Sequence, residues 1–336
     1  MPMDPNHLPT AQLAGQRLMA GFTGTDLNAE LKFLIRELKV GGVILFSRNL
    51  ETPEQTRDLC DSIQAFARAC GLPPVFIAID QEGGVVARLK EPFTQFRGNP
   101  YIRNEKDAEI FAVTTARELN QVGINMNMAP VMDVAPKDIE SIMAERVFGS
   151  DPVWVSRLGM EIIDHFQKNK ILAVAKHFPG IGRTTNDSHI DQPVLSTPLA
   201  DLKSTDLIPF GAGIDCGVAG IMLSHICYQQ IDPRWPASLS KQIAVDLLRN
   251  QMGFNGIVLT DDLDMGAIAK HHDIPTAIRQ ILAADVDIAL ICHSGPNIGI
   301  AFEEIEKRLS ESADMKEKGY ESARRILYLK AKYIGS

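Results

Sequence analysis

The sequence predicts a closed (β/α)8 barrel, an α/β fold of the TIM type, formed as a single domain by residues 1–336. Eight short apolar runs alternate with longer amphipathic stretches. The runs are almost continuously apolar, which is typical of parallel strands covered by helices. Eight such pairs fit a closed barrel or an open doubly wound sheet. No GxGxxG motif follows an early strand, which disfavours a dinucleotide-binding sheet, and no linker divides the chain.

The strands and helices follow from this alternation in chain order. Thr52, followed by Pro53, is a favourable start for one of the helices. The apolar runs predict strands at 17–22, 42–46, 75–79, 124–128, 172–176, 219–223, 256–260 and 287–291. The amphipathic stretches predict helices at 27–38, 53–69, 106–121, 152–168, 241–252, 274–284, 303–309 and 315–333.

Composition narrows the class of protein. The net charge is −8, whereas nucleic-acid binding normally requires a basic surplus, so we expect no nucleic-acid partner. No apolar run is long enough to span a membrane, and the N-terminus lacks the pattern of a signal peptide. The five cysteines form no CxxC pair, which indicates reduced thiols. These features predict a cytoplasmic enzyme without a membrane partner.

Ionisable and polar side chains gather where the predicted strands end. The carboxyl ends of parallel barrel strands share one face, and active sites of such barrels lie there. Charged groups at several strand ends therefore predict a site, although a ring of capping residues is the alternative. The side chains concerned are Asp80, Asp133, Lys176, His177, Ser224, His225, Asp261 and Asp262.

A long polar loop follows the fifth predicted strand. Gly180 and Gly182 permit unusual backbone angles and a close approach to a ligand. Asp187 and His189 lie two residues apart, and if their side chains meet, the carboxylate would orient the imidazole and favour its protonated form. His189 would then donate a proton near neutral pH. A surface histidine is the alternative, and a metal site with His177 lacks a recognisable ligand spacing.

Two adjacent carboxylates, Asp261 and Asp262, end the seventh predicted strand. Adjacent strand residues point to opposite faces, so we expect one carboxylate to take part in the reaction and the other to support the structure. A carboxylate at this position is able to attack the anomeric carbon of a sugar. A capped turn between strand and helix is the alternative interpretation.

A third segment follows the strand that ends at residue 79. Asp80 suits the paired hydroxyls of a sugar, and Arg88 supplies a forked donor. Gly83 and Gly84 also suggest a phosphate loop, but the lysine and hydroxyl residue of that motif are missing. Arg146 is a further donor on a loop, with a surface ion pair as its alternative role.

Together these segments resemble glycoside hydrolase family 3, and in particular the single-domain bacterial β-N-acetylglucosaminidases of cell-wall recycling. The resemblance extends from Gly15 through the last predicted strand. It departs from the usual family pattern at Ile181, where a histidine is common, and at Arg183 and Val85. The motifs that carry it lie at 41–49, 80–84, 127–134, 176–180, 187–189 and 260–263.

The resemblance implies a role for each site residue and no metal or organic cofactor. Asp261 is the implied nucleophile, and Asp187 with His189 forms the implied acid/base pair. Many family members use a glutamate from a second domain, which we do not expect in a chain that ends soon after the barrel. The positions implied to hold the non-reducing N-acetylglucosamine are Asp80, Arg88, Arg146, Lys176 and His177.

The expected reaction is retaining hydrolysis of a small β-linked N-acetylglucosamine conjugate, through a covalent glycosyl-enzyme. The muropeptide fragments of the cell wall are the implied substrates. Phosphorolysis is one alternative, because a histidine acid does not repel phosphate as a carboxylate would. A catalytically silent sugar-binding barrel and hydrolysis assisted by the substrate's acetamido group are the others.

Overall fold

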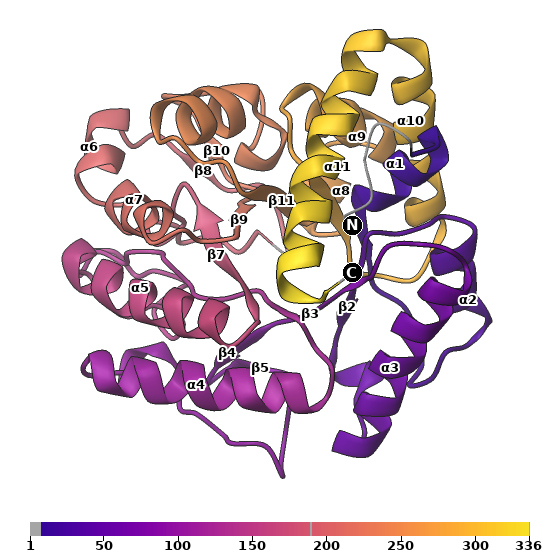
Figure 1. Ribbon diagram of the computed structural model, residues 1–336. Helices are drawn as coiled ribbons and strands as arrows, with labels where there is room; N and C mark the ends of the chain where they lie inside the picture. The colour runs from indigo at the N-terminus through magenta and orange to yellow at the C-terminus, as the bar shows by residue number, and fades with distance from the viewer. Residues whose placement is uncertain (1–7, 189, 336) are drawn as a thin grey trace.

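The fold is a closed barrel of eight parallel strands, which confirms the (β/α)8 prediction. The computed structural model describes residues 8–188 and 190–335. The strands follow the order β1-β12-β11-β9-β7-β6-β3-β2 around the barrel, and Figure 1 shows the helices arranged around them. The barrel strands are β1 Leu18–Ala20, β2 Gly42–Leu45, β3 Phe76–Ile79, β6 Met126–Asn127, β7 Leu172–Phe178, β9 Gly220–Leu223, β11 Ile257–Asp262 and β12 Ile288–Ile291.

Each of the eight predicted runs overlaps one of these strands, although β7 and β11 extend two residues beyond their predicted ends. Strand β6 has only two residues where five were predicted. Pro130 follows closely and cannot donate a backbone hydrogen bond, so the regular ladder ends early. Asn127 takes over part of this pairing: its side chain accepts from Gln81 N at 3.0 Å and donates to Gln81 O at 3.1 Å.

The predicted helices are present, and short helices that the pattern did not predict join them. Thr52 caps α3 as expected, since its Oγ1 accepts from Gln55 N at 3.1 Å. Within the described residues, no helix is both long and apolar enough to cross a membrane. The α-helices are α1 Thr10–Gln16, α2 Ala29–Arg36, α3 Pro53–Ala69, α4 Glu105–Gln121, α5 Pro152–Lys168, α6 Leu199–Ser204, α7 Leu207–Asp215, α8 Gly266–Ala269, α9 Ile274–Ala283, α10 Pro296–Glu311 and α11 Ala313–Tyr333.

Smaller elements complete the chain. The 3-10 helices η2 to η4 lie at Ser47–Asn49, Asn99–Tyr101 and Ala237–Leu239, and η5, Gln242–Gln251, is a π-helix. Strands β4 (Gln81–Gly83) and β5 (Val86–Ala87) pair antiparallel beside the carboxyl end of β3. Strands β8 (Val194–Leu195) and β10 (Cys227–Tyr228) pair in parallel.

The core has two layers because alternate strand residues face opposite ways. One layer, with Ile44, Phe76 and Met222, fills the barrel together with residues of helix α11. The other, with Val43 and Ile77, packs between the strands and the outer helices. Both layers are almost fully buried, so the barrel is a rigid frame for the side chains at its strand ends.

Candidate active site

A cavity of about 240 Å³ opens at the carboxyl ends of the barrel strands. Asp261 at the end of β11 lies on its wall, together with Asp80, which directly follows β3. Seven of the eight sequence-predicted site residues line this one cavity, and the eighth, His189, lies outside the described residues. The seven are Asp80, Arg88, Arg146, Lys176, His177, Asp187 and Asp261.

Lys176 lies at the centre of a buried network of charges. Its Nζ is 2.8 Å from Asp80 Oδ1 and 2.6 Å from Glu82 Oε1. Arg146 forms a bidentate pair with Glu82, with its NH2 2.7 Å from Oε1 and its Nε 3.0 Å from Oε2. Arg88 NH2 lies 3.6 Å from Asp80 Oδ2. Two carboxylates and three cations thus share one side of the cavity.

These charges stay ionised despite their burial. Burial opposes the charged form of Asp80, but Lys176 and Arg88 outweigh it and hold the pKa of this carboxyl below its ordinary value. Burial acts in the same way on Glu82, and Lys176 with Arg146 again lowers its pKa. For Lys176 the two carboxylates outweigh burial and raise the pKa. Fixed charges of this kind suit the hydroxyl groups of a sugar, which both donate and accept hydrogen bonds.

His177 is fixed by Asp133, a buried residue that the sequence analysis included among the strand-end groups without a specific role. The imidazole Nδ1 lies 2.8 Å from Asp133 Oδ2, and the Nε2 lies 3.4 Å from Arg146 NH2. Because the arginine only donates, this arrangement favours a proton on Nδ1 of His177. Asp133 also accepts from the backbone N–H of Ile181 at 2.8 Å, which ties the following loop to the site.

Asp261 is the carboxylate at the end of β11 that faces the cavity. Burial opposes its ionisation, but electrostatic interactions with His177 and His225 and a hydrogen bond from Asp262 N keep its pKa below the ordinary value. That N–H lies 2.8 Å from Asp261 Oδ1. Asp261 is therefore an anion at neutral pH, as a nucleophile must be.

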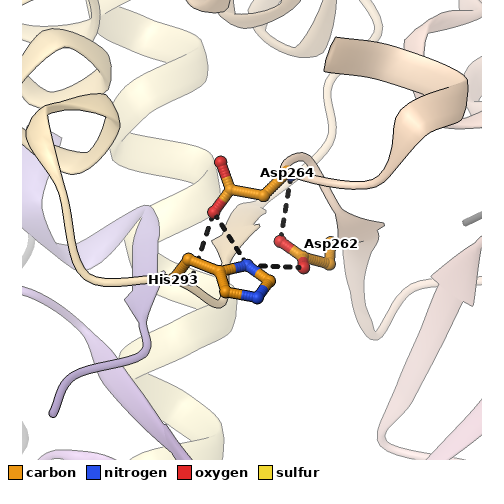
Figure 2. Close-up of side chains that lie close together, drawn as sticks. All are labelled: Asp262, Asp264 and His293. Carbon is orange, nitrogen blue, oxygen red and sulfur yellow. Dashed lines mark hydrogen bonds and ion pairs between the residues drawn. The ribbon is translucent and has the colours of Figure 1, made fainter. Parts of the chain in front are cut away.

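Asp262 has a different environment from its neighbour. Its Oδ1 accepts backbone N–H groups from Asp264 at 3.1 Å and from Cys292 at 2.9 Å, so it ties β11 to the end of β12. Burial raises the pKa of Asp262 to about 6. Asp262 also lies near Asp264 and His293 (Figure 2), and the three side chains offer ligands of the kind that hold metal ions.

His225 supports the end of β11 through a hydrogen bond to its backbone. It is buried, with Nδ1 2.7 Å from Ser238 Oγ and Nε2 2.8 Å from the backbone oxygen of Asp262. Burial lowers its pKa. The sequence placed this histidine at a strand end, and its contacts are those of a residue that positions the Asp261–Asp262 turn.

The loop after β7 is anchored at two points along its length. Arg183 Nε donates to Asp206 Oδ2 at 2.9 Å, so this side chain is a loop anchor. Further along, the backbone oxygen of Ser188 accepts from Ala267 N at 3.0 Å, next to helix α8. Asp187 is exposed and lines the cavity mouth. The loop thus passes close to the turn that carries Asp261.

The fold and this cavity define the class of the protein as a (β/α)8 barrel with a buried, charged site at the carboxyl ends of its strands. Residues 10–329 match the glycosyl hydrolase family 3 N-terminal domain. The chain belongs to this family, which confirms the resemblance that the sequence motifs indicated.

Similar proteins agree with this assignment. A β-hexosaminidase of Alkalilimnicola ehrlichii is 36% identical over 285 residues, which cover 82% of this chain and 80% of the relative. A family 3 β-N-acetylglucosaminidase of Paenibacillus sp. str. FPU-7 superposes with a TM-score of 0.92 at 33% identity. The match covers 98% of this chain and 63% of the Paenibacillus chain. A β-N-acetylhexosaminidase of Beutenbergia cavernae gives a TM-score of 0.88 at 30% identity, over 96% of this chain and 99% of its own.

Proposed function

We propose that this protein is a retaining β-N-acetylglucosaminidase that releases terminal non-reducing N-acetylglucosamine from small β-linked conjugates. The observation that carries the proposal is Asp261, an ionised carboxylate on the wall of a cavity that also presents Asp80, Lys176 and Arg88. The family match and the activities named for the similar proteins support the choice of sugar.

In the proposed mechanism, Asp261 attacks C1 of the bound sugar and forms a covalent glycosyl-enzyme. His189, as an imidazolium, gives its proton to the glycosidic oxygen as the leaving group departs. The neutral imidazole then takes a proton from water, which attacks C1 and frees the sugar. Asp187, at the cavity mouth, is the proposed partner that orients His189. No metal or organic cofactor takes part in these steps.

The charged network is proposed to bind the sugar hydroxyls. Asp80 accepts from them, while Lys176, Arg88 and Arg146 donate, and His177 contributes its imidazole. Because Lys176 is already fixed by Asp80 and Glu82, it loses little side-chain freedom when a sugar binds. This pre-organisation supports binding of the non-reducing ring in one orientation.

We also propose a setting for this activity. Muropeptide fragments are the natural substrates, in a protein that works in the cytoplasm as one barrel domain and binds neither nucleic acid nor membrane. The five cysteines are free, which supports a reducing compartment. The net charge of −8 supports the absence of a nucleic-acid partner.

An assay with an aryl β-N-acetylglucosaminide tests the function, with the matching aryl β-glucoside as the control substrate. We expect turnover of the first to exceed that of the second. In phosphate buffer the product should be free N-acetylglucosamine. Accumulation of the sugar 1-phosphate would instead establish a phosphorylase. Sugar binding without turnover of either substrate would establish a silent barrel.

The role of His189 predicts a dependence on the leaving group. His189→Ala should slow single-turnover glycosylation much more for a natural disaccharide than for an aryl glycoside, whose leaving group needs little protonation. The measurement is the glycosylation rate of both substrates for both proteins. Equal losses for the two substrates would count against His189 as the acid.

A further inference from the structure

Three side chains with metal-binding atoms lie close together in a part of the chain that adjoins the proposed nucleophile (Figure 2). They are Asp262 and Asp264 from the end of β11 and its following turn, and His293, which follows β12. One ligand atom from each lies within 4.8 Å of the other two. The proposed mechanism gives none of them a chemical role.

The distances between these side chains are longer than those of a direct hydrogen bond. Nδ1 of His293 lies 3.5 Å from Asp264 Oδ2 and 3.7 Å from Asp262 Oδ2. Hydrogen bonds from nitrogen to oxygen span roughly 2.7–3.2 Å, so the imidazole is too distant to bond either carboxylate. Two ligands on one tetrahedral zinc ion, with bonds of about 2.0–2.2 Å, lie about 3.3–3.6 Å apart. The imidazole nitrogen therefore lies between the carboxylates at close to the separation that a shared cation requires.

Hydrogen bonds from neighbouring groups hold both carboxylates in place, and each carboxylate turns its Oδ2 toward the imidazole. Oδ1 of Asp262 accepts the backbone N–H groups of Asp264 and Cys292. Oδ1 of Asp264 accepts from Asn297 Nδ2 at 2.8 Å, and its Oδ2 accepts from the backbone N–H of His293 at 3.1 Å. Supporting bonds of this kind orient the ligands of a metal site before the metal arrives.

The local charge also favours a cation. Asp261, Asp262 and Asp264 place three carboxyl groups within four residues. Among the described residues, the imidazole of His293 lies within 4.0 Å of both carboxylates, and neither carboxylate pairs with a lysine or an arginine. The His293 side chain is 68% exposed, which leaves a path for an ion to enter and room for water as a further ligand.

We propose that Asp262, Asp264 and His293 form a binding site for a divalent transition-metal ion such as zinc. An imidazole and two carboxylates suit zinc, whereas magnesium and calcium prefer oxygen ligands alone. The bound ion joins the carboxyl ends of β11 and β12 and stabilises the turn that carries Asp261. This role is structural and independent of the hydrolytic mechanism.

Isothermal titration of the untagged, chelator-treated protein with zinc chloride tests the site. The wild type should bind one zinc ion per chain, and His293→Ala should lower the affinity by about tenfold or more. The matched control is His165→Ala, which removes a histidine that also faces a carboxylate, Glu161, at 3.5 Å on the remote helix α5. This control should bind zinc as the wild type does.

Thermal unfolding supplies a second measurement. Zinc should raise the Tm of the wild type and of His165→Ala but not of His293→Ala, because only a folded site binds the ion. Magnesium chloride at the same concentration should have no such effect. Failure of the wild type to bind zinc, equal zinc affinity in His293→Ala, or equal binding of magnesium would each overturn the proposal. Because His293 is exposed, its replacement should preserve the fold, which circular dichroism checks.

Discussion

At the scale of single residues, Glu82 is central to the charged side of the cavity. It is 2% exposed and bonds both Lys176 and Arg146. Glu82→Gln keeps the shape but leaves those two cations without their shared counter-charge. We expect unfolding free energy to fall by about 3–5 kcal/mol, the usual loss when one partner of a buried ion pair is removed. The KM for the aryl glucosaminide should rise as well.

Urea unfolding and steady-state kinetics measure both effects. The matched control is Glu109→Gln, which breaks the exposed Glu109–Lys106 pair at 2.9 Å on α4 and should change stability little. If Glu82→Gln proved as harmless as this control, the buried network would not be a source of stability.

The sequence predicted some residues of this site and not others. Asp80, Lys176 and Asp261 follow or end apolar runs, and parallel barrel geometry brings such positions together. Glu82 was not predicted as a site residue, and Asp133 was predicted only as one of the charged groups at the strand ends. The roles of both depend on side-chain partners 94 and 44 residues away in the chain. The one available signal for Glu82 was its place inside the motif that begins at Asp80.

At the scale of elements, the loop after β7 depends on Gly182. A Cβ atom on Gly182 would lie 1.9 Å from the backbone oxygen of Val134, next to Asp133. Gly182→Ala must therefore displace the loop from this backbone, and we expect unfolding free energy to fall by about 1–3 kcal/mol. Because the same loop reaches the cavity mouth at Asp187, kcat/KM should fall as well.

A second glycine provides the control for that prediction. Gly211 lies in helix α7, and an added Cβ would meet no atom within 4 Å. Gly211→Ala should therefore stabilise the protein, by about 0.5–1 kcal/mol, because alanine is the better helix former. Denaturant unfolding and kcat/KM of both variants give the comparison. Equal effects of the two substitutions would contradict the close packing at Gly182.

The elements themselves were largely predictable. Strands buried on both faces leave a strong apolar signal, so all eight were found, and the capped helix that begins at Pro53 was found with its bounds. Helix α7 was missed because Pro209, Gly211 and Gly213 weaken its local helical preference. It forms because Leu207, Phe210 and other side chains pack against the barrel, which is a tertiary effect.

At the scale of the whole molecule, helix α11 brings Lys330 into the core layer that fills the barrel. Lys330 is 1% exposed, its Nζ donates to Gln16 Oε1 at 2.6 Å, and it lies 5.1 Å from the centre of the Phe76 ring. Burial lowers its pKa to about 7 from 10.5. Between these two values the unfolded chain holds a proton that the folded protein has lost. Raising the pH through this window therefore favours the folded state.

Lys330→Met should remove this pH dependence. Relative to the variant, wild-type unfolding free energy should rise by on the order of 3 kcal/mol between about pH 7 and about pH 10. Urea unfolding of both proteins at the two pH values measures the difference. Parallel pH profiles would mean that Lys330 keeps an ordinary pKa in the folded protein.

The account as a whole depends on covalent attack by Asp261, and trapping with a 2-fluoro glycosyl donor tests this directly. The fluorine slows breakdown of the glycosyl-enzyme, so the labelled peptide can be isolated and mapped by mass spectrometry. We predict that the sugar is attached to Asp261, and that Asp261→Asn folds normally but takes up no label and shows no turnover. A label on any other carboxylate, or an active enzyme that is never labelled, would contradict the proposed mechanism.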